Sequence, residues 1–451
     1  MRPLPAIDPA YHGVWQSDGY GYLVDIAADR ARLFHITPAQ CLPAEEGADD
    51  VHRFLAEHPP ELTDGGERMR IGEPGDTWGV PVRRRVDLPV ACDAPTPRGA
   101  VANFAAFADL FSAHYAFFDL YGVDWTKTVE AMRPRIEDGM SDAALFGVFR
   151  EMLAPLRDGH VTLRGRVDGD DVEYEPHEGE TVSRLRAQAA DRGILFDRYA
   201  GQFLKHHWMT GVRQTLLGGE GRLGGDRLIQ YGMLDEAVGY LGLLTMAGFS
   251  GNRDIEFTDA ADDYRVFDAV LDEAMDRFAQ RGARAVVVDL SVNFGGFDRI
   301  GRELAARFAS RKTLAYEKWP GDFPGAEPFA LFVEPNSRPG FSGPVYVLTS
   351  DITVSAGETA TMALRALPGV THLGDTTRGA LSDVLDKSLP NGWEISLSNE
   401  VYRDSDGVMW EGRGIAPQVP LTVFDPADPH RGHVEAVRRV QARARRDLGL
   451  R

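Results

Sequence analysis

The chain has 451 residues, of which 43% are hydrophobic and 10% are aromatic. That length and apolar content predict a globular protein with roughly two to four domains, each able to bury a core. The net charge of −19 repels phosphate backbones and anionic lipid surfaces, so we expect neither nucleic acid nor a membrane as a partner.

Residues 1–95 predict a small accessory β module, because apolar and polar residues alternate from Gly13 to Thr37 on either side of the turn AADR. The start of the chain contains no apolar segment typical of a secretion signal, and no stretch is apolar enough to span a membrane, so we expect a cytoplasmic protein. The two cysteines, Cys41 and Cys92, are too few for a disulfide framework. We expect them to be reduced, partly buried thiols.

Residues 96–165 predict a helical subdomain, since large apolar side chains recur with the spacing of one helix face. In chain order these are Phe104, Phe107, Phe111, Tyr115, Phe118, Leu145, Val148, Phe149, Met152 and Leu156. The segment ends in LRDGHVTL, which places His160 directly after the last helix. We interpret the apolar residues as core and the histidine as a candidate site residue.

Residues 166–235 are interpreted as an insertion, with an acidic loop over 166–182 and a glycine-rich loop further on. Gly219, Gly221 and Gly224 match the spacing GxGxxG, but no predicted strand precedes them and no helix follows, which argues against a dinucleotide site. A neighbouring HH pair cannot face one side of a helix and has no further metal ligands near it. We therefore expect no cofactor and no metal.

Residues 236–425 predict a layered α/β domain in which apolar strands alternate with amphipathic helices, and residues 426–451 predict a basic C-terminal helix. The apolar strand Ala285–Leu290 leads into Asn293 and the pair Gly295–Gly296. Two adjacent glycines let a backbone approach a ligand and direct N–H groups at it. An ordinary strand-to-helix turn explains the glycine pair as well.

The segment PVYVLTSDITVSAGETATMALRAL, residues 344–367, runs an apolar strand through a tight turn into a helix, with Ser355 at the bend. A serine there lies near unpaired backbone N–H groups, which stabilise an alkoxide and the oxyanion formed when it attacks a carbonyl. The alternative is that the serine only caps the helix. Further on, GDTTRGALSD (374–383) and EGRGIAPQ (411–418) predict short strands and turns.

Together, DLSVNFGG, TSDITVSAGET, GDTTRGALSD and EGRGIAPQ resemble the motifs of the tail-specific, or C-terminal processing, serine peptidases, in particular the branch that includes the tricorn protease core. The resemblance covers roughly residues 100–425. It implies an α/β fold with a crotonase-like (ClpP/crotonase) layered catalytic core, beside the helical subdomain and the small N-terminal β module. It also implies cleavage of peptide bonds through an acyl-enzyme.

Residue by residue, the resemblance implies that Ser355 is the nucleophile. It implies that the oxyanion hole consists of the backbone N–H of Ala356 together with one from Gly295 or Gly296. The chemistry requires such donors, because the tetrahedral intermediate of acyl transfer carries a negative oxygen.

The same resemblance matches His160 to the general base and Glu411 to the carboxylate of the tricorn type. A serine hydroxyl needs an imidazole to take its proton, and a carboxylate fixes the tautomer of that imidazole. Two positions depart from the family pattern: Gly159 replaces the serine that precedes the histidine in tricorn, and Ser291 replaces the arginine usual after DL. Glu411 is therefore expected to reach the imidazole directly or through water.

A Ser/Lys dyad is excluded at the expected place, because Ala380 occupies the position that carries the lysine in other members. Lys387 is interpreted as a solvated surface residue. Many members carry a PDZ domain upstream of the core, but residues 166–235 contain no recognisable carboxylate-binding loop.

The sequence thus predicts a cytoplasmic serine endopeptidase that acts on a peptide or protein substrate, with homo-oligomerisation left open. Two other classes fit the same residues. One is a non-catalytic ligand- or peptide-binding member of the same fold. The other is an acyl transferase or cyclase that uses the same serine and passes the acyl group to an amine.

Overall fold

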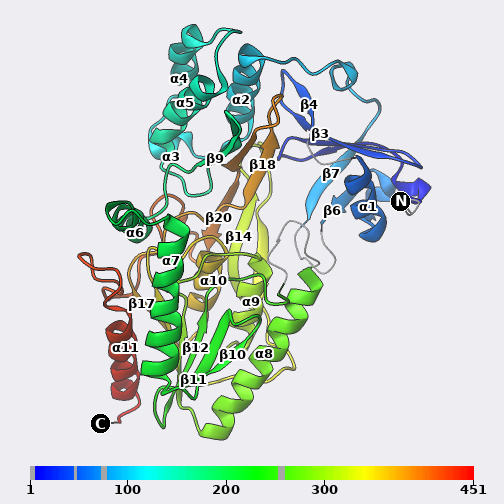
Figure 1. Cartoon of the computed structure of the whole chain (residues 1–451). Coiled ribbons are helices and arrows are strands. Elements are labelled where there is room, and N and C mark those ends of the chain that lie inside the picture. The colour runs from blue at the N-terminus through cyan, green and yellow to red at the C-terminus, as the bar shows by residue number, and fades with distance from the viewer. Residues whose placement is uncertain (1–5, 45–47, 73–78, 252–259, 451) are drawn as a thin grey trace. The chain divides into compact units, whose positions relative to one another are not determined.

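The computed structural model describes residues 6–44, 48–72, 79–251 and 260–450. The chain forms two compact units, each built from three separate segments (Figure 1). The first unit consists of Met1–His177, Trp319–Pro328 and Ser382–Val401, and the second consists of Glu178–Lys318, Phe329–Leu381 and Tyr402–Arg451. None of the helices within the described ranges is long and apolar enough to cross a lipid bilayer.

The N-terminal part of the first unit contains an antiparallel sheet in which the described strands follow the order β4-β3-β2-β1-β7-β6-β5. The strands are β1 (Gly13–Ser17), β2 (Tyr22–Ile26), β3 (Ala31–Ile36), β4 (Cys41–Pro43), β5 (Glu61–Thr63), β6 (Arg68–Ile71) and β7 (Val80–Arg85), with helix α1 (Ala48–Glu57) between β4 and β5. Trp15 and Val24 from the sheet pack with Leu55 from the helix and form a small core. The turn AADR joins β2 to β3, where the sequence predicts it.

A disulfide joins Cys41 and Cys92, whose Cα atoms lie 4.9 Å apart. The prediction of two reduced thiols is therefore wrong. The cysteines are 51 residues apart in sequence, and they meet because the short 3-10 helix Val90–Asp93 returns alongside β4. Closing a loop of that length stabilises the fold by about 4 kcal/mol if the effect is unfolded-state entropy alone.

Four helices come next in the first unit: α2 (Ala100–His114), α3 (Phe118–Tyr121), α4 (Trp125–Met132) and α5 (Asp142–Leu153). Phe107 of α2 stacks on Phe149 of α5, with ring centroids 4.0 Å apart, and both are buried, as their helical spacing predicts. The described strands of a second sheet follow in the order β18-β19-β8-β9, namely Val384–Ser388, Glu394–Ser398, Thr162–Val167 and Asp170–Tyr174. The acidic segment predicted as a loop therefore contains β9 and its hairpin turn.

The second unit is built around a sheet whose described strands follow the order β10-β11-β12-β13-β16-β17-β21. They are Arg222–Gly224, Ile229–Met233, Val238–Leu243, Ala285–Asp289, Val345–Thr349, Val370–Gly374 and Val419–Pro420, and the pairs from β12 to β21 are parallel. A parallel sheet needs crossover connections that cover its faces. The α/β fold predicted from alternating strands and helices is confirmed.

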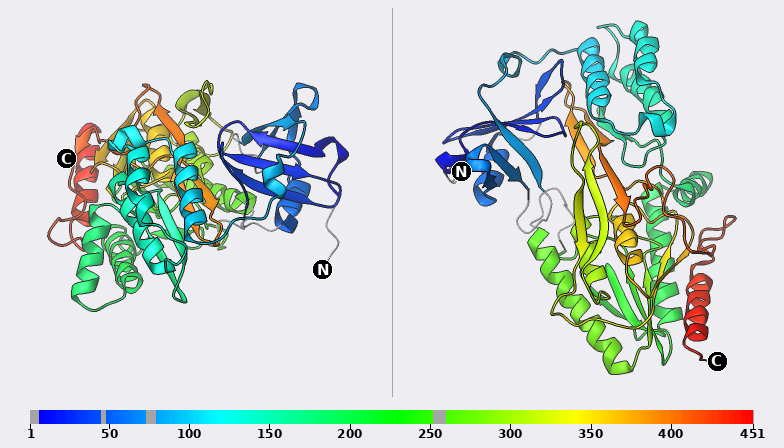
Figure 2. Two further views of the ribbon diagram at one scale, coloured as in Figure 1. Left: turned by 90° about the horizontal axis from the view of Figure 1, so that it is seen from above. Right: turned by 180° about the vertical axis from the view of Figure 1, so that it is seen from behind.

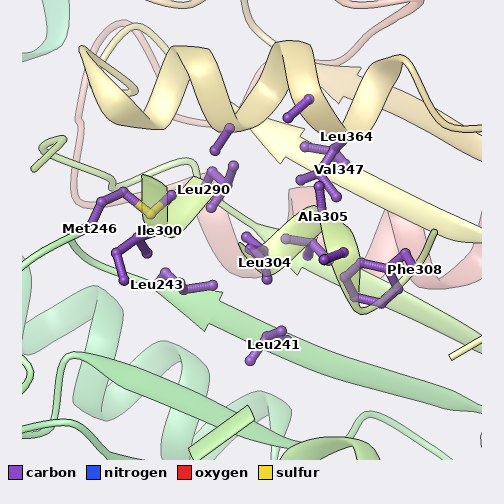
Figure 3. Packing of buried hydrophobic residues seen from close by; sticks show 14 of the residues in the cluster. Leu241, Leu243, Met246, Leu290, Ile300, Leu304, Ala305, Phe308, Val347 and Leu364 are labelled. Carbon is purple, nitrogen blue, oxygen red and sulfur yellow. The ribbon is translucent and has the colours of Figure 1, made fainter. Parts of the chain in front are cut away.

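Both faces of this sheet are buried. On one face, Val286 and Val288 of β13 pack with helices α8 (Ala260–Arg281), α9 (Asp298–Ala306) and α10 (Ala356–Arg365), in the core that Figure 3 shows in part. On the other face, Ala285 and Val287 pack with α6 (Glu180–Asp191), α7 (Phe196–Leu204) and α11 (His433–Asp447). The π-helical continuation of α7, Lys205–Leu216, lies beside α11 (Figure 2). Burial on both faces explains why β13 reads as a continuous apolar run.

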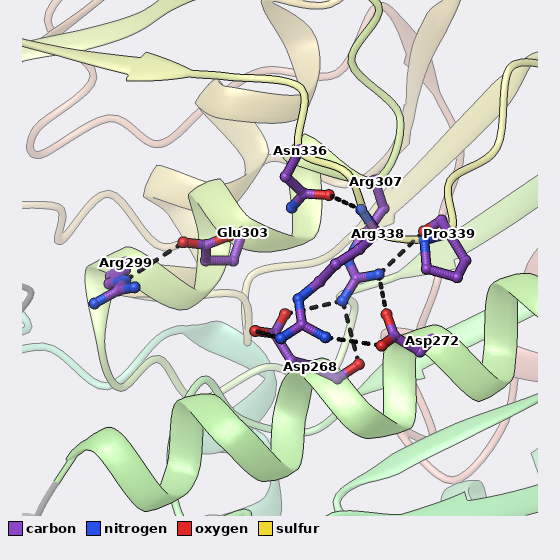
Figure 4. Close-up of polar contacts among 8 residues, drawn as sticks. All are labelled: Asp268, Asp272, Arg299, Glu303, Arg307, Asn336, Arg338 and Pro339. Atoms are coloured by element: carbon purple, nitrogen blue, oxygen red, sulfur yellow. Dashed lines mark hydrogen bonds and ion pairs between the residues drawn. The ribbon is translucent and has the colours of Figure 1, made fainter.

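The described residues also form a short sheet with the strand order β15-β14-β20, and its first strand along the chain, β14, follows α9. In sheet order the strands are Phe329–Val333, Thr313–Pro320 and Glu400–Asp404. Near it, Arg307 is fully buried and bonds to Asp268, 2.9 Å from its Nη2, and to Asp272 of helix α8 (Figure 4). Arg338 pairs with the same two carboxylates. The network holds the end of α9 against α8, and its loss would leave a buried charge without a partner.

Candidate functional site

Ser355 lies at the turn between β16 and helix α10, where it is the N-cap residue. Its backbone has φ 57° and ψ −125°, a conformation that residues with a side chain rarely adopt. Strained backbone of this kind concentrates at functional sites, because the surrounding structure must hold it in place. A sharp turn from a strand into a helix also brings a serine hydroxyl to the edge of the sheet, next to the N-terminus of the helix.

Glu358 holds this turn from the first turn of α10. Its Oε2 accepts hydrogen bonds from the N–H of Ser355 at 3.3 Å and from that of Ala380 at 2.9 Å. Its Oε1 accepts from the N–H of Gly379 at 2.8 Å and from the hydroxyl of Thr377. Glu358 is not among the site residues expected from the sequence, although Ser-x-x-Glu at a helix start is the spacing of a capping box.

We predict that Glu358 makes the stability of the second unit depend on pH. Burial raises the pKa of Glu358 from 4.5 to about 7, against the hydrogen bonds from Thr377, Gly379 and Ala380. The folded state therefore binds a proton that the unfolded state releases, and stability should fall as the pH rises from about 4.5 to about 7, by about 3 kcal/mol. Thermal unfolding across this range should show the fall in the native protein and lose it in Glu358→Gln; an identical pH dependence in both would contradict the assignment.

Gly295 and Gly296 follow the end of β13, and their backbone lies close to the turn that carries Ser355. Gly295 has φ 79°, and a Cβ there would lie 2.6 Å from the Cβ and 3.1 Å from the Oγ of Ser355. Gly296 has φ 136°, and a Cβ there would lie 2.6 Å from the carbonyl carbon of Met246. The close approach that the glycine pair suggested is therefore present, and it is an approach to the candidate nucleophile.

Asn293 fixes the shape of this glycine loop. It is fully buried, its Nδ2 donates to the carbonyl of Leu243 at 3.1 Å, and its Oδ1 accepts from the N–H of Gly295 at 3.0 Å. Among the hydrogen bonds described for this part of the chain, the N–H of Gly295 is thus engaged, whereas those of Gly296 and Ala356 donate to no protein acceptor. The first N–H groups of a helix have no partner within it, which applies to Ala356.

The two loops around Ser355 are joined by hydroxyl groups. The hydroxyl of Ser350 donates to the carbonyl of Ser291 at 2.6 Å, and the hydroxyl of Thr353 donates to the carbonyl of Leu290 at 2.7 Å. All four residues are buried. The serine and threonine residues of TSDITVS therefore tie the turn that carries Ser355 to the loop that carries the glycine pair.

His160 belongs to the first unit, where it follows α5 in a tight turn. Its N–H donates to Oδ1 of Asp158 at 2.9 Å, and Asp158 also accepts from the hydroxyls of Tyr115 at 2.9 Å and Ser398 at 3.1 Å. Asp158 is fully buried, and His160 is 8% exposed. The conformation of the turn that carries the imidazole is thus fixed by a buried carboxylate two residues earlier.

Glu411 belongs to the second unit and is 1% exposed. Its Oε2 accepts a hydrogen bond from the N–H of Leu381 at 3.0 Å. The backbone of the next residue is bonded to the same segment, since the N–H of Gly412 donates to the carbonyl of Gly379 at 2.7 Å. The glutamate therefore lies against the same TRGAL segment that Glu358 holds beneath Ser355.

The structure also shows the surroundings of Ala380 and Lys387, the two residues considered for a Ser/Lys dyad. Ala380 is buried, and its carbonyl accepts the N–H of Ser355 at 3.0 Å, so a methyl group occupies this position beside the serine. The prediction that Lys387 is solvated is wrong, because it is 1% exposed and its ammonium group donates to the carbonyl of Tyr20 at 2.6 Å. That ammonium group also lies 3.6 Å from the ring centroid of Tyr22, which favours a desolvated cation.

Two parts of the chain match known protein families. Residues 238–421 match peptidase family S41, and residues 102–154 match the tricorn protease C1 domain. The chain therefore falls in the class of serine-type peptidases. Within that class, the part from 238 to 421 is similar to family S41 and the part from 102 to 154 to a tricorn domain, which confirms the resemblance seen in the sequence.

Solved structures share the fold. A protein proposed to be a peptidase, from Parabacteroides merdae ATCC 43184, is 21% identical, with a TM-score of 0.59 over 77% of this chain and 97% of its own. Mature CPAF in complex with lactacystin is 13% identical, with a TM-score of 0.54 over 77% of this chain and 99% of its own. No curated protein sequence matches the chain. At these identities the structural similarity shows the fold alone.

Proposed function

We propose that the protein is a serine endopeptidase that hydrolyses peptide bonds through an acyl-enzyme. The observation that carries the proposal is the strained turn at Ser355, whose Oγ lies beside the backbone of Gly295 and at the start of α10. A residue that only caps a helix does not require this φ value, since N-caps commonly adopt extended backbone. The family match supports a peptide or protein substrate.

In the proposed reaction, His160 takes the proton of Ser355 as Oγ attacks the peptide carbonyl carbon, and the N–H groups of Gly296 and Ala356 bind the oxyanion. Gly296 is preferred to Gly295 because the N–H of Gly295 already donates to Asn293. The C–N bond then breaks, and the imidazole passes the proton to the leaving amine. Water attacks the ester, gives its proton to the imidazole, and the proton returns to Oγ.

Glu411 is proposed to orient His160, directly or through one water. Its burial supports this role, since a carboxylate that is 1% exposed needs hydrogen-bond donors around it. Gly159 precedes the histidine and provides no intervening side chain.

Several finer attributes belong to the same proposal. They are a crotonase-like core and tail-specific cleavage, against which the missing PDZ domain argues, and homo-oligomerisation is left open. A cytoplasmic location remains a prediction, and the Cys41–Cys92 disulfide favours an oxidising compartment instead. Localising the full-length protein in its native cell would decide between the two compartments.

Analysis of products tests the proposal against the two other classes. An unfolded protein is incubated with the native chain and with Ser355→Ala, with and without an added amine, and the peptides are identified by mass spectrometry. We expect new C-termini with the native chain, made by addition of water. Products that carry the amine at the expense of hydrolysis would indicate an acyl transferase, and intact substrate under all conditions would indicate a binding protein.

A further inference from the structure

A buried hydrogen bond between a histidine and an aspartate lies beneath the glycine loop, and it joins residues that are far apart in sequence. Asp289 is the last residue of β13, and His433 is the first residue of α11. Nε2 of His433 lies 2.8 Å from Oδ2 of Asp289, and their side chains are 2% and 4% exposed. The imidazole Nε2 therefore carries the proton in this hydrogen bond.

The carboxylate of Asp289 is also bonded to the start of the glycine loop. Its Oδ1 accepts from the N–H of Ser291 at 2.9 Å and from the hydroxyl of Ser291 at 2.6 Å, and its Oδ2 accepts from the hydroxyl of Tyr240 at 2.8 Å. Although burial raises the pKa of Asp289, the charge of His433 and these hydrogen bonds hold it below its usual value. The carboxylate of Asp289 is thus stable in its charged form.

The contacts continue from Ser291 to the candidate nucleophile. The carbonyl of Ser291 accepts the hydroxyl of Ser350, and that hydroxyl oxygen accepts from the N–H of Ile352 at 3.0 Å. The carbonyl of Asn293 accepts from the N–H of Val354 at 3.2 Å, next to the serine. Asp289 therefore fixes one end of a hydrogen-bonded loop whose other parts place the oxyanion donors and Ser355.

We propose that His433 of the C-terminal helix is a positioning residue for catalysis, which acts through Asp289 and Ser291 on the oxyanion loop. The inference rests on the proposed function. Ser291 stands where the resemblance leads us to expect an arginine, and in this chain a buried hydrogen-bond donor beside Asp289 comes from α11. The other role open to the pair is anchoring α11 to the sheet, which would affect stability without affecting the chemical step.

Two variants of His433 separate these roles. The amide nitrogen of Gln reaches about as far as Nε2 of histidine, so His433→Gln can still donate to Asp289. The shorter side chain in His433→Asn cannot. Arg445→Ala is the matched control, because Arg445 anchors the far end of the same helix to Asp235, 3.0 Å away, and to Glu236, 2.7 Å away, both outside the loop.

The rate of fluorophosphonate labelling at Ser355, the kcat and KM for peptide cleavage, and the thermal unfolding midpoint are measured for each variant. We expect His433→Asn to lower kcat and the labelling rate by about 10- to 100-fold with KM unchanged, less than the roughly 10²- to 10³-fold loss on deleting an oxyanion donor. His433→Gln should recover most of the rate. Arg445→Ala should lower only the unfolding midpoint.

If His433→Asn does not fold, Ser291→Ala tests the same contact chain. This variant loses the hydrogen bond from the Ser291 hydroxyl to Asp289 and leaves α11 in place. We expect it to lower kcat as well, and its effect should not add to that of His433→Asn, since both act through one contact chain. Unchanged kcat and labelling rate in a folded His433→Asn or in Ser291→Ala would overturn the inference. Absence of labelling in the native protein would instead overturn the proposed function.

Discussion

Replacing Ser355 by alanine should abolish peptide cleavage, with a fall in kcat of at least about 10³-fold, while the protein stays folded. The hydroxyl carries the covalent step, whereas its loss as a helix cap costs only about 1 kcal/mol. Cleavage of a fluorogenic peptide and the thermal unfolding midpoint are the measurements.

Ser141→Ala is the matched control for this variant. Ser141 caps α5, where its hydroxyl accepts the N–H of Ala144 at 3.3 Å, so the same atoms are removed from another helix start. We expect a similar loss of stability and no loss of cleavage. If Ser355→Ala kept its rate, the nucleophile would have to be another residue.

Replacing His160 by alanine should lower kcat by roughly 10²- to 10⁴-fold, because the serine then loses its general base. In the native protein, activity should rise with pH through a single ionisation near neutrality, since only the neutral imidazole can take the proton. The measurements are kcat and kcat/KM over a range of pH values for both proteins.

Glu358 must be separated from His160 in this experiment, because burial raises its pKa to about 7 and it lies beneath Ser355. Glu358→Gln removes that ionisation and keeps the imidazole. If His160 is the base, the rise with pH persists in Glu358→Gln. A flat profile in that variant, or a His160→Ala protein with native rate and profile, would assign the ionisation elsewhere.

Sequence reasoning succeeded where the determinants are local. The run from Val345 to Arg365 gives a strand, a turn and a helix because apolar residues, small residues and helix formers follow one another along the chain. The close approach of Gly295 to Ser355 also follows from its residue type. Glu358 could have been found the same way, from its capping-box spacing.

Contacts that depend on residues distant in the chain could not be predicted from the sequence. Lys387 is polar and sits in a strand beside the exposed Asp386, and it is buried against the N-terminal segment that contains Tyr20 and Tyr22. The Cys41–Cys92 disulfide and the contact of Asp289 with His433 likewise form because the fold brings distant segments of the chain together. No periodicity or spacing encodes such contacts, since each arises from tertiary packing.

The most direct measurement of the central claim is reaction of the native protein with a fluorophosphonate probe, followed by proteolysis and peptide mapping. The proposed mechanism predicts one adduct, on the peptide that contains Ser355, with loss of that adduct in Ser355→Ala and slow labelling in His160→Ala. Peptide cleavage that continues while Ser355 remains unmodified, or an adduct on a different serine, would contradict it.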